Sequence, residues 1–226
     1  MTTKSSRRGT GSAEARARAS VVEAARAMSR QGLSPGRSGN VSRRWKAGML
    51  ITPTGMTYDA MRAADIVFVG ANGEVGDKRR KPSSEWRFHA AAYSARPDAG
   101  AVVHTHSLHA TVLACAQRAI PAFHYMVAVA GGADIPLVPY ATFGSAELAA
   151  HIAKGLKDRN ACLLANHGLI AIGPTLDEAL ELATEVEVLA EQYCKVLTLG
   201  EPKILPADEM ARVLERFKSY GQKAQG

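Results

Sequence analysis

Apolar residues in this chain recur at two spacings, one typical of helices that bury one face and the other typical of buried strands. In residues 13–31 the apolar positions Val21, Ala25 and Met28 share a helical face, and Gly32 suits the left-handed turn that ends many helices. Similar spacing or helix-start residues occur further along the chain. They predict helices from about 84 to 95, over 107–117, from Gly144-Ser145 onward, from Thr175 to about 198, and over about 207–219.

Short stretches between these segments, bounded by turns, predict strands. They cover residues 41–45, 48–52, 66–69, 100–105 and 161–173, and the last of them contains a tight turn. Several strands follow one another through connections that are too short for a helical crossover, which parallel neighbours need. The pattern therefore favours a central, mostly antiparallel mixed sheet flanked by helices, which is a three-layer α/β fold.

The composition is that of one globular domain. The chain has 226 residues, of which 46% are hydrophobic, and this is enough for a sizeable core. Residues 1–12 are polar and basic, so we predict a disordered basic tail there and a single domain over 13–226. No run approaches the roughly 18 apolar residues of a membrane span, and no secretory leader is visible. The three scattered cysteines lack disulfide or zinc spacing, which favours a cytoplasmic location.

The net charge of +7 comes from one end of the chain. Residues 1–46 hold eleven Lys/Arg and two Glu, whereas the remainder has a small excess of acidic residues. A basic arm is one feature of nucleic-acid-binding proteins, but no nucleic-acid-binding module follows it here. We therefore predict no nucleic-acid partner and interpret the basic surface as one that attracts a small phosphorylated substrate.

Two histidines at the end of a predicted strand are the first candidate for chemistry. In the stretch AVVHTHSLH, His104 and His106 are two residues apart, so both imidazoles point to one face and can chelate one metal ion. A pair of surface or hydrogen-bonded histidines is the alternative. Three imidazoles with an open fourth position would make a catalytic zinc site. The third ligand could be His109, His124, His151 or His167, and spacing alone does not choose among them.

Two local patterns bear on the choice of the third ligand and on the acid/base group that a catalytic metal needs. His167 precedes a glycine at a turn, where glycine can take backbone angles that expose the imidazole. Glu85 follows Ser83 and Ser84 at a helix start, where either serine can cap the helix. Glu85 is then either an acidic first-turn residue or a catalytic carboxylate beside an anion-binding helix terminus. The loops GRSGN (36–40) and TPTG (52–55) offer further hydroxyls and backbone N–H groups for a phosphate.

Seven sequence segments occur in an order that we can relate to a known family. They are SGNVS, MLITPTGM, KPSSEWRFHAAAYSARPDAGAVVHTHSLH, IPAFHYM, PYATFGS, NHGLIA and, near the C-terminus, RFKSYG. Together they resemble the class II aldolase/adducin family over about residues 14–221, and most closely its members that cleave fuculose 1-phosphate. The fold of that family, a mostly antiparallel sheet flanked by helices, agrees with the fold predicted above.

The resemblance implies a role for each matching residue. The metal ligands are then His104, His106 and His167, holding Zn²⁺ or another divalent metal such as Mn²⁺ or Co²⁺, while Glu85 is the catalytic acid/base. Tyr125 and Tyr220 match tyrosines that lie near the reacting aldehyde across a subunit interface of a homotetramer. The residues implied for substrate phosphate are Asn40, Thr54, Gly55, Ser83 and Ser84. Arg37 stands where the fuculose-phosphate pattern has threonine, and its guanidinium could grip phosphate or point to solvent.

The activity implied by the resemblance is that of an aldehyde-lyase. It cleaves a ketose 1-phosphate of the fuculose, 5-deoxyribulose or 5-methylthioribulose type to dihydroxyacetone phosphate and an aldehyde. The same scaffold also supports sugar-phosphate 4-epimerases, sugar-acid phosphate decarboxylases and methylthioribulose-phosphate dehydratases. Adducin-like members are scaffold proteins without the site, but this chain has all three histidines and Glu85.

Overall fold

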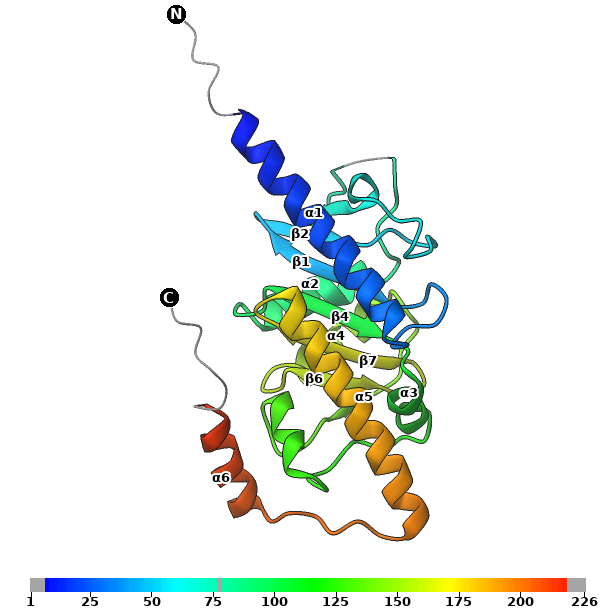
Figure 1. Cartoon of the computed structure of the whole chain (residues 1–226), viewed down its shortest axis with the longest axis vertical. Helices are drawn as coiled ribbons and strands as arrows, with labels where there is room; N and C mark the ends of the chain where they lie inside the picture. Colours follow the sequence, from blue (N-terminus) through cyan, green and yellow to red (C-terminus); the bar gives the residue numbers. More distant parts are fainter. Residues whose placement is uncertain (1–6, 77–78, 219–226) are drawn as a thin grey trace, which may run out of the picture.

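A seven-stranded sheet forms the middle of the computed structural model, which describes residues 7–76 and 79–218, with side chains from residue 13 (Figure 1). The spatial order of the strands is β3-β2-β1-β4-β7-β6-β5. Neighbours are antiparallel except β5 and β6, which are parallel, so the mostly antiparallel mixed sheet is confirmed. The strands are β1 (Asn40–Trp45), β2 (Gly48–Ile51), β3 (Val67–Gly70), β4 (Ala101–Thr105), β5 (Leu137–Val138), β6 (Ala161–Leu164) and β7 (Gly168–Gly173).

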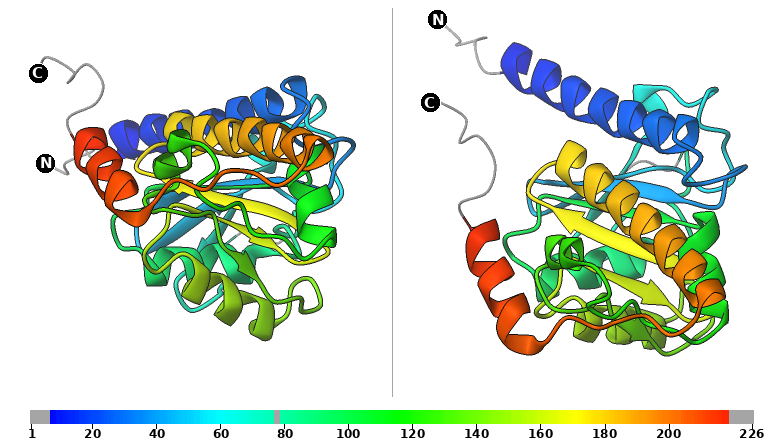
Figure 2. Two further views of the ribbon diagram at one scale, coloured as in Figure 1. Left: turned by 90° about the horizontal axis from the view of Figure 1, so that it is seen from below. Right: turned by 60° about the horizontal axis from the view of Figure 1, so that its bottom comes forward.

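Helices cover both faces of this sheet, which gives the expected three layers (Figure 2). One face carries α1 (Arg7–Arg30) and α5 (Leu176–Leu199), with α3 (Leu108–Cys115) packed against α5. The opposite face carries α2 (Trp86–Ala95) and α4 (Ala146–Gly155), which pack against each other. Two short 3₁₀ helices, η1 (Ala63–Asp65) and η2 (Tyr125–Ala130), lie in the connections, and α6 (Ala207–Phe217) packs on η2 through Met210.

Strict alternation along the strands divides the core into two halves. In β4, Val103 belongs to the core under α1 and α5, whereas Val102 belongs to the core under α2 and α4. Leu169 and Ile170 of β7 alternate in the same way. Because successive side chains of a strand point to opposite faces, this alternation places His104 on the face covered by α2.

Two expected helix starts differ from the structure, and one strand was not expected. Helix α1 begins at Arg7, so residues 7–12 of the expected tail are helical, while residues 1–6 lie outside the described part. Adding a turn to an existing helix costs little, even where Gly9 and Gly11 lower helix propensity. The capping residue of α2 is Glu85 rather than Ser83 or Ser84. Strand β5 was missed because two residues are too few to show a period.

The described helices include none that is both long and apolar enough to cross a bilayer.

We expect the Leu163→Ala substitution to lower the free energy of unfolding by about 2–5 kcal/mol, because it removes a fully buried side chain between β6 and the helices. The matched control is Leu199→Ala at the end of α5, where the side chain is 89% exposed and the change should stay within about 0.5 kcal/mol. Urea unfolding at one fixed protein concentration measures both. Equal losses in the two variants would contradict the placement of the core.

Candidate metal centre

His104 and His106 stand at the end of β4, on the side of the sheet that α2 covers. His104 is fully buried, and its Nδ1 lies 2.9 Å from the carbonyl oxygen of Leu169 on β7. A carbonyl only accepts hydrogen bonds, so Nδ1 carries a hydrogen and Nε2 is the nitrogen that faces the site. His106 follows two residues later, and its Nε2 lies 3.0 Å from Nε2 of His104. Both imidazoles therefore present a ring nitrogen to the same point.

His167 reaches that point from the tight turn between β6 and β7. Glycine was expected to supply the unusual backbone angle of this turn, but Asn166 supplies it, with φ of 54°. Asparagine tolerates this left-handed conformation better than most residues. Gly168 has a different role, because a Cβ atom at this position would lie 2.3 Å from the carbonyl oxygen of Thr105. The absent side chain lets the turn approach β4 closely enough for His167 to face His104 and His106.

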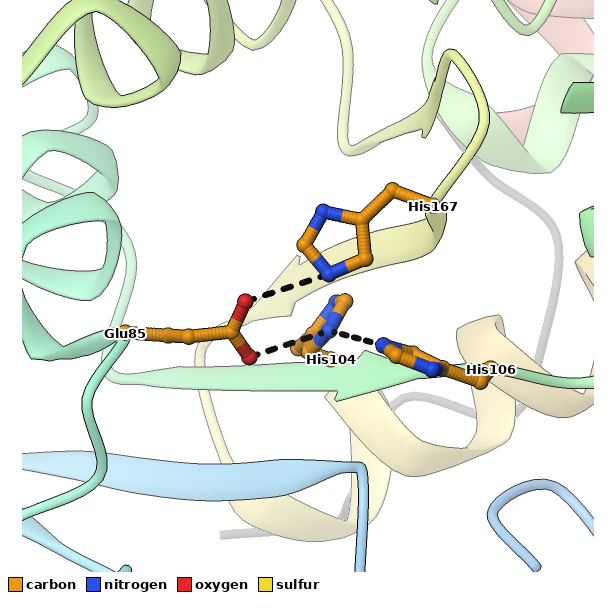
Figure 3. Close-up of side chains that lie close together, drawn as sticks. All are labelled: Glu85, His104, His106 and His167. Carbon is orange, nitrogen blue, oxygen red and sulfur yellow. Dashed lines mark hydrogen bonds and ion pairs between the residues drawn. The ribbon is translucent and has the colours of Figure 1, made fainter. Parts of the chain in front are cut away.

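Glu85 is held opposite the three imidazoles at the start of α2 (Figure 3). Its Oε1 lies 3.1 Å from Nε2 of His167, and its Oε2 lies 3.3 Å from Nε2 of His104. The side-chain amide of Asn40 donates a hydrogen bond of 2.8 Å to Oε2. The β1–β4 register pairs Asn40 with His104, so the sheet itself brings this amide to the carboxylate.

These four side chains fit a divalent metal ion. Their ligand atoms all lie within 4.8 Å of one another. Burial, followed by the charges of His104 and His167, lowers the pKa of His106 to about 3, so its imidazole is neutral, as metal binding requires. Two imidazole nitrogens that face each other at 3.0 Å need a proton or a metal ion between them. Three imidazoles and one carboxylate are a donor set for zinc and similar transition metals.

The ionisation of Glu85 follows from the same neighbours. Burial on its own raises the pKa of this carboxyl group, but the charge and hydrogen bonds of His104 and His167 outweigh that effect. The pKa of Glu85 is therefore held well below its ordinary value, and the group is a carboxylate.

Comparison with known sequences decides the family. The family model described as the class II aldolase and adducin N-terminal domain matches residues 19–194. The chain belongs to the class II aldolase and adducin family. An aldolase of Rhodospirillum rubrum named for 5-methylthioribulose 1-phosphate and 5-deoxyribulose 1-phosphate is 57% identical, with coverage of 91% of this chain and 92% of the relative. An L-fuculose phosphate aldolase of Escherichia coli K12 is 52% identical, with coverage of 89% and 94%.

Solved structures of this class II aldolase family show the same fold. A structure described as L-fuculose 1-phosphate aldolase matches with a TM-score of 0.87 and 40% sequence identity. The match covers 90% of this chain and 96% of that structure. The three-layer arrangement around the mixed sheet is therefore the fold of the family.

Two of the six candidate phosphate residues line a pocket beside Glu85. Arg37 and Ser84 line this pocket, which has a volume of about 320 Å³, together with His106 and His167. The Arg37 side chain lines the pocket and is also tied to a neighbouring loop. Its Nη1 donates a hydrogen bond of 2.9 Å to the carbonyl oxygen of Gly55. Backbone hydrogen bonds then join Thr54 to Lys81, and Ser83 to Thr52. The three candidate loops are thus one connected structure.

Neither candidate tyrosine, Tyr125 or Tyr220, lies at the site in the described part of one chain. Tyr125 begins η2, is half exposed, and stacks on the ring of His124 instead of lining the pocket. Tyr220 lies outside the described residues.

The other candidate histidines have separate partners. His109 contacts Glu187 of α5, with 2.9 Å between its Nδ1 and the carboxylate oxygen. The backbone N–H of Met126 donates a hydrogen bond to Nδ1 of His124, and Nδ1 of His151 lies 3.1 Å from the carbonyl oxygen of Pro139. The choice of the third imidazole, which spacing left open, therefore falls on His167 in the described structure.

Sequence reasoning missed His89, Ser42 and Tyr93, which are buried behind Asn40 and joined to it by hydrogen bonds. A signal for them existed. His89 lies four residues after Glu85, which puts both on one face of α2, and Ser42 lies two residues after Asn40 on one face of β1.

Replacement of His167 by Ala should lower metal affinity by at least about tenfold, because it removes one of three converging imidazoles. His151→Ala is the matched control, since His151 lies outside the cluster, and it should bind metal like the parent. Elemental analysis of both proteins after equilibration with a zinc buffer gives metal per chain. Full occupancy in the His167 variant at limiting free zinc would contradict the ligand set.

Proposed function

We propose that this protein is a metal-dependent class II aldolase that reversibly cleaves a ketose 1-phosphate to dihydroxyacetone phosphate and an aldehyde. The observation that carries the proposal is the convergence of His104, His106, His167 and Glu85 beside a pocket lined by Arg37 and Ser84. A carboxylate next to a metal-binding cluster suits proton transfer at carbon, and the cationic rim suits a phosphate. Relatives named for fuculose, methylthioribulose and deoxyribulose phosphates point to the same class of substrate.

The three imidazoles hold the metal, for which we propose zinc, with manganese or cobalt as substitutes. When bound, the metal acts as a Lewis acid that polarises the ketone oxygen and stabilises negative charge on it. Glu85 has two tasks. Without substrate its carboxylate faces the cluster as a fourth donor group, and with substrate present it acts as the base.

The proton transfers can be written for the direction that makes the ketose. The carboxylate of Glu85 takes a proton from the hydroxymethyl carbon of dihydroxyacetone phosphate. The electron pair left on that carbon forms the bond to the aldehyde carbon, and the aldehyde oxygen takes up a proton. Tyr125 or Tyr220 of a neighbouring copy is the proposed donor of that proton. In cleavage the same bond breaks and both protons return by the same groups.

The phosphate does not react, and its binding orients the carbon that does. Arg37, already fixed to the carbonyl of Gly55, offers the free part of its guanidinium to the pocket. Asn40 gives one amide hydrogen to Glu85 and has a second that remains for the substrate. The proposed phosphate-binding residues are Arg37, Asn40, Thr54, Gly55, Ser83 and Ser84.

We also propose that the protein is a homotetramer of the cytoplasm with active sites between subunits. Support for the assembly comes from Tyr125, whose half-exposed ring serves no site in its own described chain, and from Leu108 and Val112, which are exposed on α3 next to the metal-binding strand. Support for the location comes from three free cysteines, which suit a reducing compartment.

A panel of ketose 1-phosphates tests the reaction. Fuculose, 5-deoxyribulose and 5-methylthioribulose 1-phosphates are each incubated with enzyme, with or without a chelator, and dihydroxyacetone phosphate is measured by a coupled reductase. We expect release from at least one substrate, loss of release with chelator, and recovery on adding zinc. A change of configuration without cleavage would show that the protein is an epimerase instead of an aldolase. Loss of CO₂ from a sugar-acid phosphate would show that it is a decarboxylase. Purified protein that binds no metal and acts on nothing would indicate a scaffold.

The Glu85→Gln substitution should lower kcat by about 10²–10⁴-fold, because the amide cannot take the proton from carbon. Metal content should stay at the parent level, since three imidazoles remain. Glu187→Gln is the matched control, because this carboxylate contacts His109 and lies outside the cluster. Turnover of the Glu85 variant at the control rate would show that another group is the base.

A further inference from the structure

A chain of four hydrogen bonds leads from Glu85 into the core. Asn40 Nδ2 lies 2.8 Å from Oε2 of Glu85, and Asn40 Oδ1 lies 2.5 Å from Nε2 of His89. His89 Nδ1 lies 2.7 Å from Oγ of Ser42, which lies 2.9 Å from the phenol oxygen of Tyr93. His89 and Ser42 are 0% exposed, and each of the other three is at most 7% exposed. The chain is therefore shielded from bulk water along its whole length.

Two elements interlock to make this chain. Glu85 stands at the start of helix α2, and the helix contributes His89 and Tyr93 at successive intervals of four residues. Strand β1 contributes Asn40 and Ser42, which are two residues apart. Each strand residue lies between two helix residues, so the five polar groups form one column between the helix and the sheet.

The direction of every hydrogen bond in this column is determined from its active-site end. A carboxylate only accepts, so the amide nitrogen of Asn40 faces Glu85 and the amide oxygen faces His89. That oxygen accepts in turn, so Nε2 of His89 carries the hydrogen and Nδ1 has the lone pair. Nδ1 accepts from the hydroxyl of Ser42, whose oxygen accepts from the phenol of Tyr93. One orientation satisfies all five groups.

We propose that His89 is a positioning residue that fixes the amide of Asn40, and through it the carboxylate of Glu85, in the orientation that proton transfer needs. The proposal rests on the function proposed above, in which Glu85 is the base. If His89 took its other tautomer, its lone pair would face the amide oxygen, and Asn40 would turn that oxygen toward the carboxylate. Two acceptors would then face each other, and Glu85 would lose its hydrogen bond.

The surroundings of His89 keep it in the neutral form that this role needs. Burial, and then the charge of His104, lowers its pKa to about 3, although the charge of Glu85 acts in the opposite direction. The ring also stacks on Phe88, with 5.0 Å between ring centroids, which restricts its rotation. Burial likewise raises the pKa of Tyr93, so the phenol stays protonated and can donate to Ser42.

The first test reads the tautomer directly and does not depend on the reaction. In protein labelled with ¹⁵N-histidine, the two ring nitrogens of His89 are identified by the loss of their NMR signals in His89→Gln. If His89→Gln does not fold, the shift of these signals in Ser42→Ala identifies them instead. We expect a neutral ring with hydrogen on Nε2. Hydrogen on Nδ1 would overturn the proposal, whatever the activity of the protein.

The second test separates positioning from packing. His89→Gln keeps a donor at the place of Nε2, whereas His89→Asn keeps a group only at the place of Nδ1. We expect kcat to fall by at least about tenfold in His89→Asn, with metal content unchanged, and to return to within about threefold in His89→Gln. Tyr93→Phe is the control, because Ser42 can still donate to His89, and its kcat should match the parent.

The outcomes are distinguishable. Parent-like kcat in folded His89→Asn overturns the proposal. Equal loss of kcat in His89→Asn, His89→Gln and Tyr93→Phe, in proportion to their melting temperatures, also overturns it, because such a loss indicates a packing role. If His89→Asn does not fold, the tautomer measurement decides, and hydrogen on Nδ1 of His89 in the parent protein overturns the proposal. Failure of the parent enzyme to act on any ketose 1-phosphate would overturn the proposed function, while the tautomer measurement would still decide the orientation of the column.

Discussion

The structure depends on one electrostatic constraint: a buried carboxylate is held beside three buried or half-buried imidazoles. Burial of charge without a partner is costly, so Glu85 and the histidines stabilise one another only if all four are placed accurately. The sheet and α2 supply this accuracy. The β1–β4 register sets Asn40 opposite His104, and the start of α2 brings Glu85 to the same edge. A shift of one residue in either strand would turn these side chains to the other face of the sheet.

Much of this arrangement could be predicted from local pattern, because alternation and helical spacing are local properties. The layers, the pair His104 and His106, and the turn that carries His167 all follow from such spacing. The identity of the third imidazole did not follow from spacing, because it depends on which turn the β4–β7 pairing brings to β4. The family resemblance supplied that ligand, and the structure now shows the contacts behind it.

Other features depend on contacts between distant segments and were therefore outside the reach of pattern. The expected glycine angle at His167 belongs to Asn166, while Gly168 is needed for its missing side chain. Arg37 looked like either a phosphate ligand or a solvent-exposed residue, and the structure shows it tied to the neighbouring loop at Gly55. The hydrogen-bonded column behind Glu85 was not predicted. The spacing of its residues places them on one face of α2 and one face of β1, but spacing does not show that these two elements pack against each other.

In the proposed mechanism, Glu85 moves a proton at carbon beside a metal held by His104, His106 and His167. Exchange of the hydroxymethyl proton of dihydroxyacetone phosphate in D₂O, followed by proton NMR without any aldehyde, tests that step alone. We expect exchange of one of the two protons by the zinc-loaded parent, and none by the metal-depleted parent or by zinc-loaded Glu85→Gln. Exchange at the parent rate by a fully metallated Glu85→Gln protein would contradict it.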